Sequence, residues 1–220
     1  MNVHDADGWS GGGGGGAALP VYDRVFEILR ERFESGEITK RRSHLIGLII
    51  GRPSEPLVQE QIIPNLSYWH HRSATFIDLF CVGFLSKEFD GGEFNRTIAM
   101  FEANTEWKYS GGTDLILVNV AYSPAEKKVT PDYSNALAVI LENVTKVEGY
   151  ERLPIFFEKV MAAAKQSFGG ESPSVVSNEV GKSLIISALK GLLTSLLPDG
   201  MKKEARDAFL FAVRDISKRS

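Results

Sequence analysis

His44-Leu45-Ile46-Gly47-Leu48-Ile49-Ile50-Gly51 is a nearly unbroken apolar run that ends at a glycine, with Pro53 two residues later. Its short length and its β-branched residues predict a buried strand, because a strand covered on both faces shows no polar alternation. Over the preceding residues 21–34, apolar side chains recur every three or four positions with charged residues between them. That spacing predicts an amphipathic helix before the strand.

The residues after this strand predict further helices and strands. A helix is expected to begin near Pro56 and to be interrupted at Pro64, since proline removes a backbone donor. The later segments predict, in order, a strand over 76–84, a turn over 87–92, a helix over 93–106, strands over 115–121 and 135–141, and a helix over 153–168. The last two strands are joined only by a polar loop, 123–132, without a helical pattern. We therefore expect them to be antiparallel.

The ends of the chain differ from this α/β region, which we place at residues 20–170. Residues 1–19 contain six consecutive glycines, and their high backbone entropy predicts a disordered, flexible tail. A stretch rich in Gly, Ser and Pro leads into 171–220, where amphipathic patterns over 180–197 and 201–218 predict a helical hairpin. We expect the hairpin either to pack on the sheet or to bind a partner or a second copy through Leu184, Leu189, Leu193 and Phe209.

Composition argues against several classes of function. The chain has 220 residues and a formal net charge of −3, whereas a protein that coats DNA or RNA needs an excess of Lys and Arg. Cys81 is the only cysteine, which excludes a disulfide, a dithiol centre and a cysteine zinc site within one chain and fits a reducing compartment. The sequence has no signal-peptide pattern and no apolar run of about 18 residues that would span a membrane. We therefore expect a cytoplasmic protein.

The predicted element order over 44–168, β-α-β-α-β-β-α, resembles that of the thioredoxin fold. The resemblance implies a central mixed four-stranded sheet flanked by helices, with the third strand antiparallel beside the first. The redox Cys-x-x-Cys of that family would lie at the end of the first strand, where this chain reads Gly51-Arg52-Pro53-Ser54-Glu55-Pro56. The family's proline before the third strand is replaced by Gly111-Gly112-Thr113. What the resemblance implies is thus a binding scaffold without disulfide chemistry; a small doubly wound domain is the competing architecture.

One candidate site is the sequence Tyr68-Trp69-His70-His71-Arg72-Ser73. Trp69 is expected to fill the core, while His70, His71 and Arg72 cap the carbonyl groups at a helix end, where cations are favoured. The alternative is acid–base catalysis by one of the histidines with Asp78, and an anion held by Arg72. Adjacent histidines point in different directions on a helix or a strand, so they do not favour a metal site.

A second candidate site combines Arg52 with Trp107, Tyr109 and Ser110. In the thioredoxin-like arrangement, the start of the third strand approaches the end of the first, and Gly111-Gly112 allows close backbone approach. Aromatic residues and arginine are typical of binding hot spots, so we expect a groove here that would suit a stacked base or a peptide equally. In the same arrangement the histidines precede the second strand, and the two clusters do not form one active site.

Two functions from different classes follow from these patterns. The favoured one is a non-catalytic interaction or adaptor protein, a subunit of a larger bacterial-type assembly, with a flexible tail and a hairpin that docks a protein partner or a second copy. The alternative is a small hydrolase or transferase acting on an anionic, phosphate-containing substrate through His70 or His71 and Arg72. The sequence carries no nucleotide or metal motif, so we expect neither a cofactor nor a metal ion.

Overall fold

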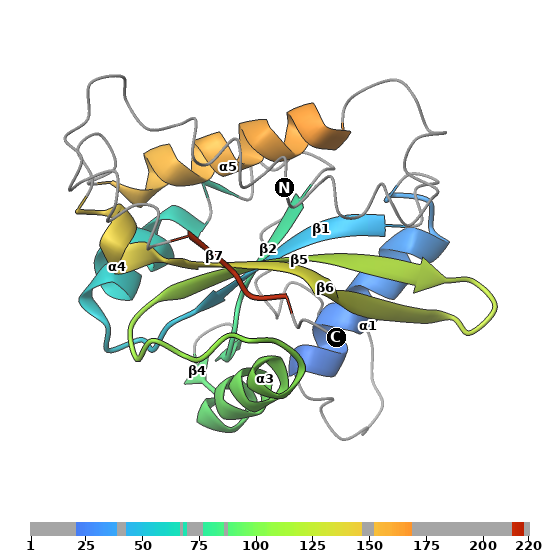
Figure 1. Cartoon of the computed structure of the whole chain (residues 1–220), viewed down its shortest axis with the longest axis horizontal. Helices are drawn as coiled ribbons and strands as arrows, with labels where there is room; N and C mark the ends of the chain where they lie inside the picture. The colour runs from blue at the N-terminus through green and yellow to red at the C-terminus, as the bar shows by residue number, and fades with distance from the viewer. Residues whose placement is uncertain are drawn as a thin grey trace.

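Strand β1 (Ser43–Ile50) lies inside a mixed five-stranded sheet whose order is β2-β1-β5-β6-β7. Figure 1 presents the chain as a computed structural model, which describes residues 21–38, 43–66, 68–69, 77–85, 88–146, 152–168 and 213–217. β1 runs parallel to β2 (Ile77–Cys81) and antiparallel to β5 (Asp114–Ser123). The α/β class is confirmed, and the sheet has one strand more than the four that were expected.

The antiparallel pairing of β5 with β6 (Lys128–Ile140) confirms the predicted direction of the last two long strands. Both strands extend into the segment that was expected to be a loop. The register shifts between Val118, which pairs with Ala136, and Val120, which pairs with Pro131. Proline lacks the N–H that a regular ladder would need, so an irregularity at this point of β6 is physically reasonable.

The fifth strand, β7 (Val213–Asp215), pairs antiparallel with β6. The prediction of helix is therefore wrong over 213–217, where Val213 and Ile216 fit a helical spacing but are instead buried at the sheet edge. The backbone of Ile216 donates to Ala136 O (3.0 Å) and accepts from Glu106 N (2.8 Å), so pairing with the sheet satisfies it. Leu184, Leu189, Leu193, Phe209 and the glycine-rich tail lie outside the described residues.

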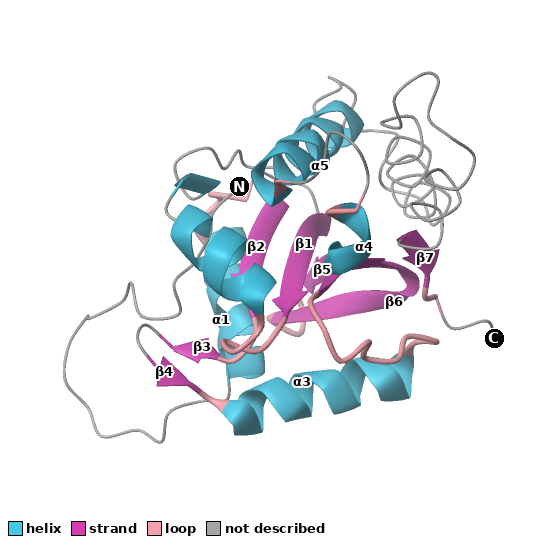
Figure 2. Cartoon of the chain, turned by 90° about the vertical axis from the view of Figure 1, so that its left-hand side faces the viewer, coloured by secondary structure: helices cyan, strands magenta, loops and turns pink. Residues whose placement is uncertain are grey.

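Helices cover both faces of the sheet, as Figure 2 shows. One face packs on α5 (Leu153–Phe168), α4 (Leu141–Val144) and η1 (Val58–Ile62); the other packs on α1 (Val21–Glu34) and α3 (Gly91–Asn104). Successive side chains of a strand alternate between these layers, and β5 is buried on both sides. The predicted bounds of α1 and α5 are confirmed, and α3 begins two residues earlier than expected.

Proline and glycine shape the connections around β2. The helix expected after Pro56 is broken at Pro64 as predicted, into a π-helical turn, η1, and a 3₁₀ turn, η2 (Ile63–Asn65). After β2, a tight turn with Gly83 at φ 81° leads into the short hairpin β3 (Phe84–Leu85) and β4 (Glu88–Phe89). Within the described residues, no helix is long and apolar enough to cross a membrane.

Candidate functional site

The end of β1 and the start of β5 lie side by side, as expected, because Ile50 pairs with Asp114. The backbone after β1 passes very close to β5: a methyl group on Gly51 would lie 2.9 Å from Thr113 Cγ2 and 2.7 Å from Val58 Cγ2. Both distances are too short for carbon atoms in contact. Glycine at position 51 therefore lets the turn that carries Arg52 lie against the start of β5.

Asp114 is a fully buried carboxylate that organises the segment before β5. Its Oδ2 accepts from Trp107 Nε1 (3.1 Å) and from the backbone N–H of Ser110 (3.1 Å), and its Oδ1 accepts from Ser110 Oγ (2.7 Å). Burial raises the pKa of Asp114, while the hydrogen bonds from Ser110 and Trp107 oppose that shift. Trp107 is itself buried, so it belongs to the core beneath this site and does not line its surface.

Tyr109 is half-buried at the surface of the same cluster. Its hydroxyl donates to Gly112 O (2.7 Å), and its backbone N–H donates to Glu102 Oε1 (3.0 Å). Burial raises the pKa of Tyr109 to about 12; the charge of Arg52 opposes this shift, and the carboxylates of Asp114, Glu55 and Glu142 add to it. The phenol is therefore neutral at physiological pH and unsuited to proton transfer there.

Arg52 is the exposed cation of this site. Its guanidinium carbon lies 5.8 Å from the centroid of the Phe94 ring, a cation–π contact with the buried start of α3. Ser110 and Gly111 are exposed beside it on the turn before β5. The structure thus brings together Arg52, Tyr109 and Ser110, three of the four residues expected to line the groove, at the surface.

One further residue of the site, Glu142, was not predicted from the sequence. Glu142, in the short helix α4, accepts the backbone N–H of Thr113 at its Oε1 (2.5 Å), and Leu141 N donates to Thr113 O (2.9 Å). These contacts attach α4 to the start of β5 across 29 residues of sequence. A helix of four residues has too little periodicity to be recognised in a sequence.

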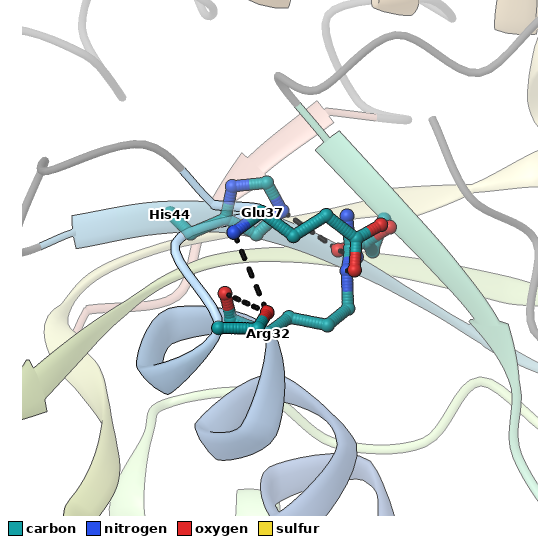
Figure 3. A network of polar contacts seen from close by, with 5 residues as sticks. Arg32, Glu37 and His44 are labelled. Carbon is teal, nitrogen blue, oxygen red and sulfur yellow. Dashed lines mark hydrogen bonds and ion pairs between the residues drawn. The ribbon is translucent and has the colours of Figure 1, made fainter.

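A second polar cluster lies between α1 and the sheet (Figure 3). Asp78 Oδ2 accepts both from Arg32 Nη1 and from His44 Nε2 (2.8 Å), and all three side chains are buried. On its outer side, Arg32 Nε lies 3.4 Å from Oε2 of the exposed Glu37. The catalytic alternative paired Asp78 with His70 or His71; among the described residues, Asp78 contacts Arg32 and His44. The cluster satisfies a buried carboxylate, as burial of a charge requires.

The Tyr68-to-Ser73 sequence is described only in part. Trp69 is fully buried and packs on Phe157 (ring centroids 4.3 Å apart), which confirms its expected place in the core. Tyr68 is exposed, and its hydroxyl donates to Glu158 Oε1 (3.0 Å). His70, His71 and Arg72 lie outside the described residues. Over the described ranges, no three His, Cys, Asp or Glu residues are grouped so that they would hold a metal ion.

Comparison with known proteins gives no relative from which a role could be inferred. The chain matches no family model, no curated protein and no solved structure. The arguments about function therefore depend on the side chains and their contacts alone.

Proposed function

We propose that the chain is a non-catalytic interaction protein that binds a protein partner at an exposed surface beside the end of β1. This surface, the Arg52 surface, consists of Arg52, Glu55, Tyr109, Ser110 and Gly111. One observation carries the proposal: the buried Asp114 carboxylate beneath it is engaged in internal hydrogen bonds, while the surface combines an exposed arginine, a half-buried aromatic ring and an exposed turn. Asp114 accepts three hydrogen bonds from Trp107 and Ser110. Such a surface suits recognition better than catalysis.

A thioredoxin-like fold is part of the proposal. The order β2-β1-β5-β6, with β2 parallel to β1 and the other two neighbours antiparallel, agrees with the arrangement that the sequence resemblance implies. The Arg52 surface then lies where that family carries its redox cysteines. The absence of a cysteine from positions 51–56 supports binding over disulfide chemistry.

Further features of the adaptor model remain proposals. They are a role as subunit of a bacterial-type cytoplasmic assembly, and docking of a partner or second copy through the 171–220 segment with Leu184, Leu189, Leu193 and Phe209. The enzymatic alternative, a hydrolase or transferase using His70, His71 and Arg72, loses some support because the carboxylate of Asp78 is engaged by Arg32 and His44.

Affinity capture with the full-length chain tests the proposal. Partners captured from the native host are identified, purified and titrated against wild type, Arg52→Glu and the control Lys128→Glu. The control makes an equal charge change at the start of β6, beside the far end of β5. We expect Arg52→Glu to weaken binding about tenfold or more and Lys128→Glu to change it less than about twofold. The proposal is wrong if no partner distinguishes the two variants, or if the purified chain has a turnover that is lost in a His70→Ala/His71→Ala variant.

A further inference from the structure

Two buried oxygen atoms beside the Arg52 surface lack a hydrogen-bond partner among the described residues: Thr113 Oγ1 and Glu142 Oε2. Thr113 is fully buried, whereas Glu142 is partly exposed. A methyl group on Gly51 would lie 3.3 Å from Thr113 Oγ1, and one on Gly112 would lie 3.1 Å from Glu142 Oε2. Thr113 Oγ1 thus lies close to the backbone of Gly51, and Glu142 Oε2 lies close to the backbone of Gly112. Buried polar atoms are nearly always paired, so an unpaired set needs an explanation.

The charges around these two oxygens favour a donor of positive charge. Glu55, Asp114 and Glu142 all act on the Tyr109 phenol, and Arg52 is the cation that opposes them there. Lys108 does not compensate, because its ammonium group lies 3.8 Å from Glu102. Asp114 already accepts three hydrogen bonds, whereas Glu142 has a buried acceptor atom without a partner among the described residues.

We propose that Glu142 binds a basic side chain, lysine or arginine, of the protein partner that the Arg52 surface recognises. The inference rests on the proposed function and adds the chemistry of the ligand. Glu142 Oε1 already holds the N–H of Thr113, so Oε2 is the atom left for an incoming ammonium or guanidinium group. Oε2 is covered in the unbound chain, so binding requires the groups that cover it to move aside.

The turn before β5 gives such a ligand room to approach. Gly111 has φ 87°, and a methyl group placed on it would meet no atom within 4 Å, so its outer side is open. Gly112 contributes no side chain between the solvent and the Glu142 carboxylate. A basic residue of an extended segment that crosses this turn can therefore reach the Glu142 carboxylate from the exposed side.

The test is an NMR titration of the ¹⁵N-labelled full chain with three blocked tripeptide amides: acetyl-Ala-Lys-Ala, acetyl-Ala-norleucine-Ala and acetyl-Ala-Glu-Ala. Each is added to about 20 mM at constant ionic strength, since a single ion pair gives millimolar affinity at best. We expect saturable shifts of the Gly111, Gly112 and Thr113 amides with the lysine peptide and at least about fivefold weaker effects with the norleucine peptide. Stronger binding of the glutamate peptide would show that Arg52 selects anions and would overturn the inference.

Charge-neutral variants locate the interaction. Glu142→Gln keeps an oxygen for the Thr113 N–H but removes the charge, and it should weaken the lysine peptide about fivefold. The control Glu126→Gln makes the same change on the exposed β5–β6 turn and should leave the titration unchanged. Equal effects of the two variants would overturn the inference. Because lysine is compared with norleucine on the wild-type chain, the test holds even if Glu142→Gln does not fold.

The two proposals fail in different ways. If a captured partner is sensitive to Arg52→Glu but binds Glu142→Gln as tightly as wild type, the interaction function stands and the basic-residue inference is wrong. If no partner depends on Arg52, the function itself is wrong, whatever the peptides do.

Discussion

Arg32 of α1 and Asp78 of β2 form a buried ion pair across 46 residues of sequence. The pair joins the first helix to an outer strand of the described sheet, and His44 of β1 shares the same carboxylate oxygen. Burial of either charge is costly unless an opposite charge offsets it.

Asp78→Asn should destabilise the fold strongly, because it removes the buried anion that accepts from both Arg32 and His44. Loss of one member of such a pair costs about 3–5 kcal/mol of the free energy of unfolding, which equilibrium urea denaturation measures. The control Glu27→Gln removes an exposed partner of Arg30 and should cost less than about 1 kcal/mol. Similar losses in the two variants would show that the buried pair has no special weight.

Gly51→Ala should destabilise the chain by about 1–3 kcal/mol, the usual range for overpacking a filled core. The added methyl would lie 2.7 Å from Val58 Cγ2 and 2.9 Å from Thr113 Cγ2, and both of those residues are buried. The matched control is Gly91→Ala, where the nearest atom lies 3.9 Å away and the residue begins α3. The melting temperatures of both variants are measured by thermal unfolding. Equal melting temperatures for Gly51→Ala and Gly91→Ala would contradict the close contact of Gly51 with Val58 and Thr113.

Asp114 should make the stability depend on pH in the acid range. Its pKa is raised in the folded chain, so the folded state holds this proton more tightly than the unfolded state does. The stabilisation is fully present below the ordinary aspartate pKa and is lost as the pH rises through the raised value. The difference in urea midpoint between wild type and Asp114→Asn should therefore change in favour of the variant as the pH rises above the ordinary aspartate pKa of about 4. A difference that stays constant with pH excludes the shift.

Tyr109 should ionise later than an ordinary tyrosine. Its phenolate absorbance, obtained as the difference between wild type and Tyr109→Phe, is expected to rise with a midpoint near pH 12. Because this pKa is raised on folding, the associated stability is lost as the pH climbs from about 10 to about 12. A midpoint near 10 would mean that the ring is open to water.

The sequence predicted best those elements whose pattern is local. The apolar run from Leu45 to Ile50 had the composition of a strand covered on both faces, and α1 and α5 had a regular amphipathic spacing. The approach of Arg52 to Tyr109 was predicted from the order and direction of the strands, which do not depend on the details of side-chain packing.

Contacts between distant positions were beyond the reach of local patterns. The pairing of Asp78 with His44, 34 residues apart, cannot be read from sequence neighbours, which pointed to His70 and His71 instead. β7 was mistaken for helix because Val213 and Ile216 are three residues apart, a spacing that suits one face of a helix. In the structure the two side chains join the cores on opposite faces of the sheet. Glu142 was not predicted because its role depends on a contact with the backbone of Thr113, 29 residues away, and not on any motif around it.

The position of β7 in the chain has a consequence for folding during synthesis. About 70 residues lie between the end of β6 at Ile140 and the start of β7 at Val213. At about 5–20 residues per second, a ribosome takes roughly 4–14 s to make them, and for that time β6 has no β7 to pair with. An uncovered strand edge is a template for pairing with other chains, so the nascent protein passes through a period in which it is prone to aggregate.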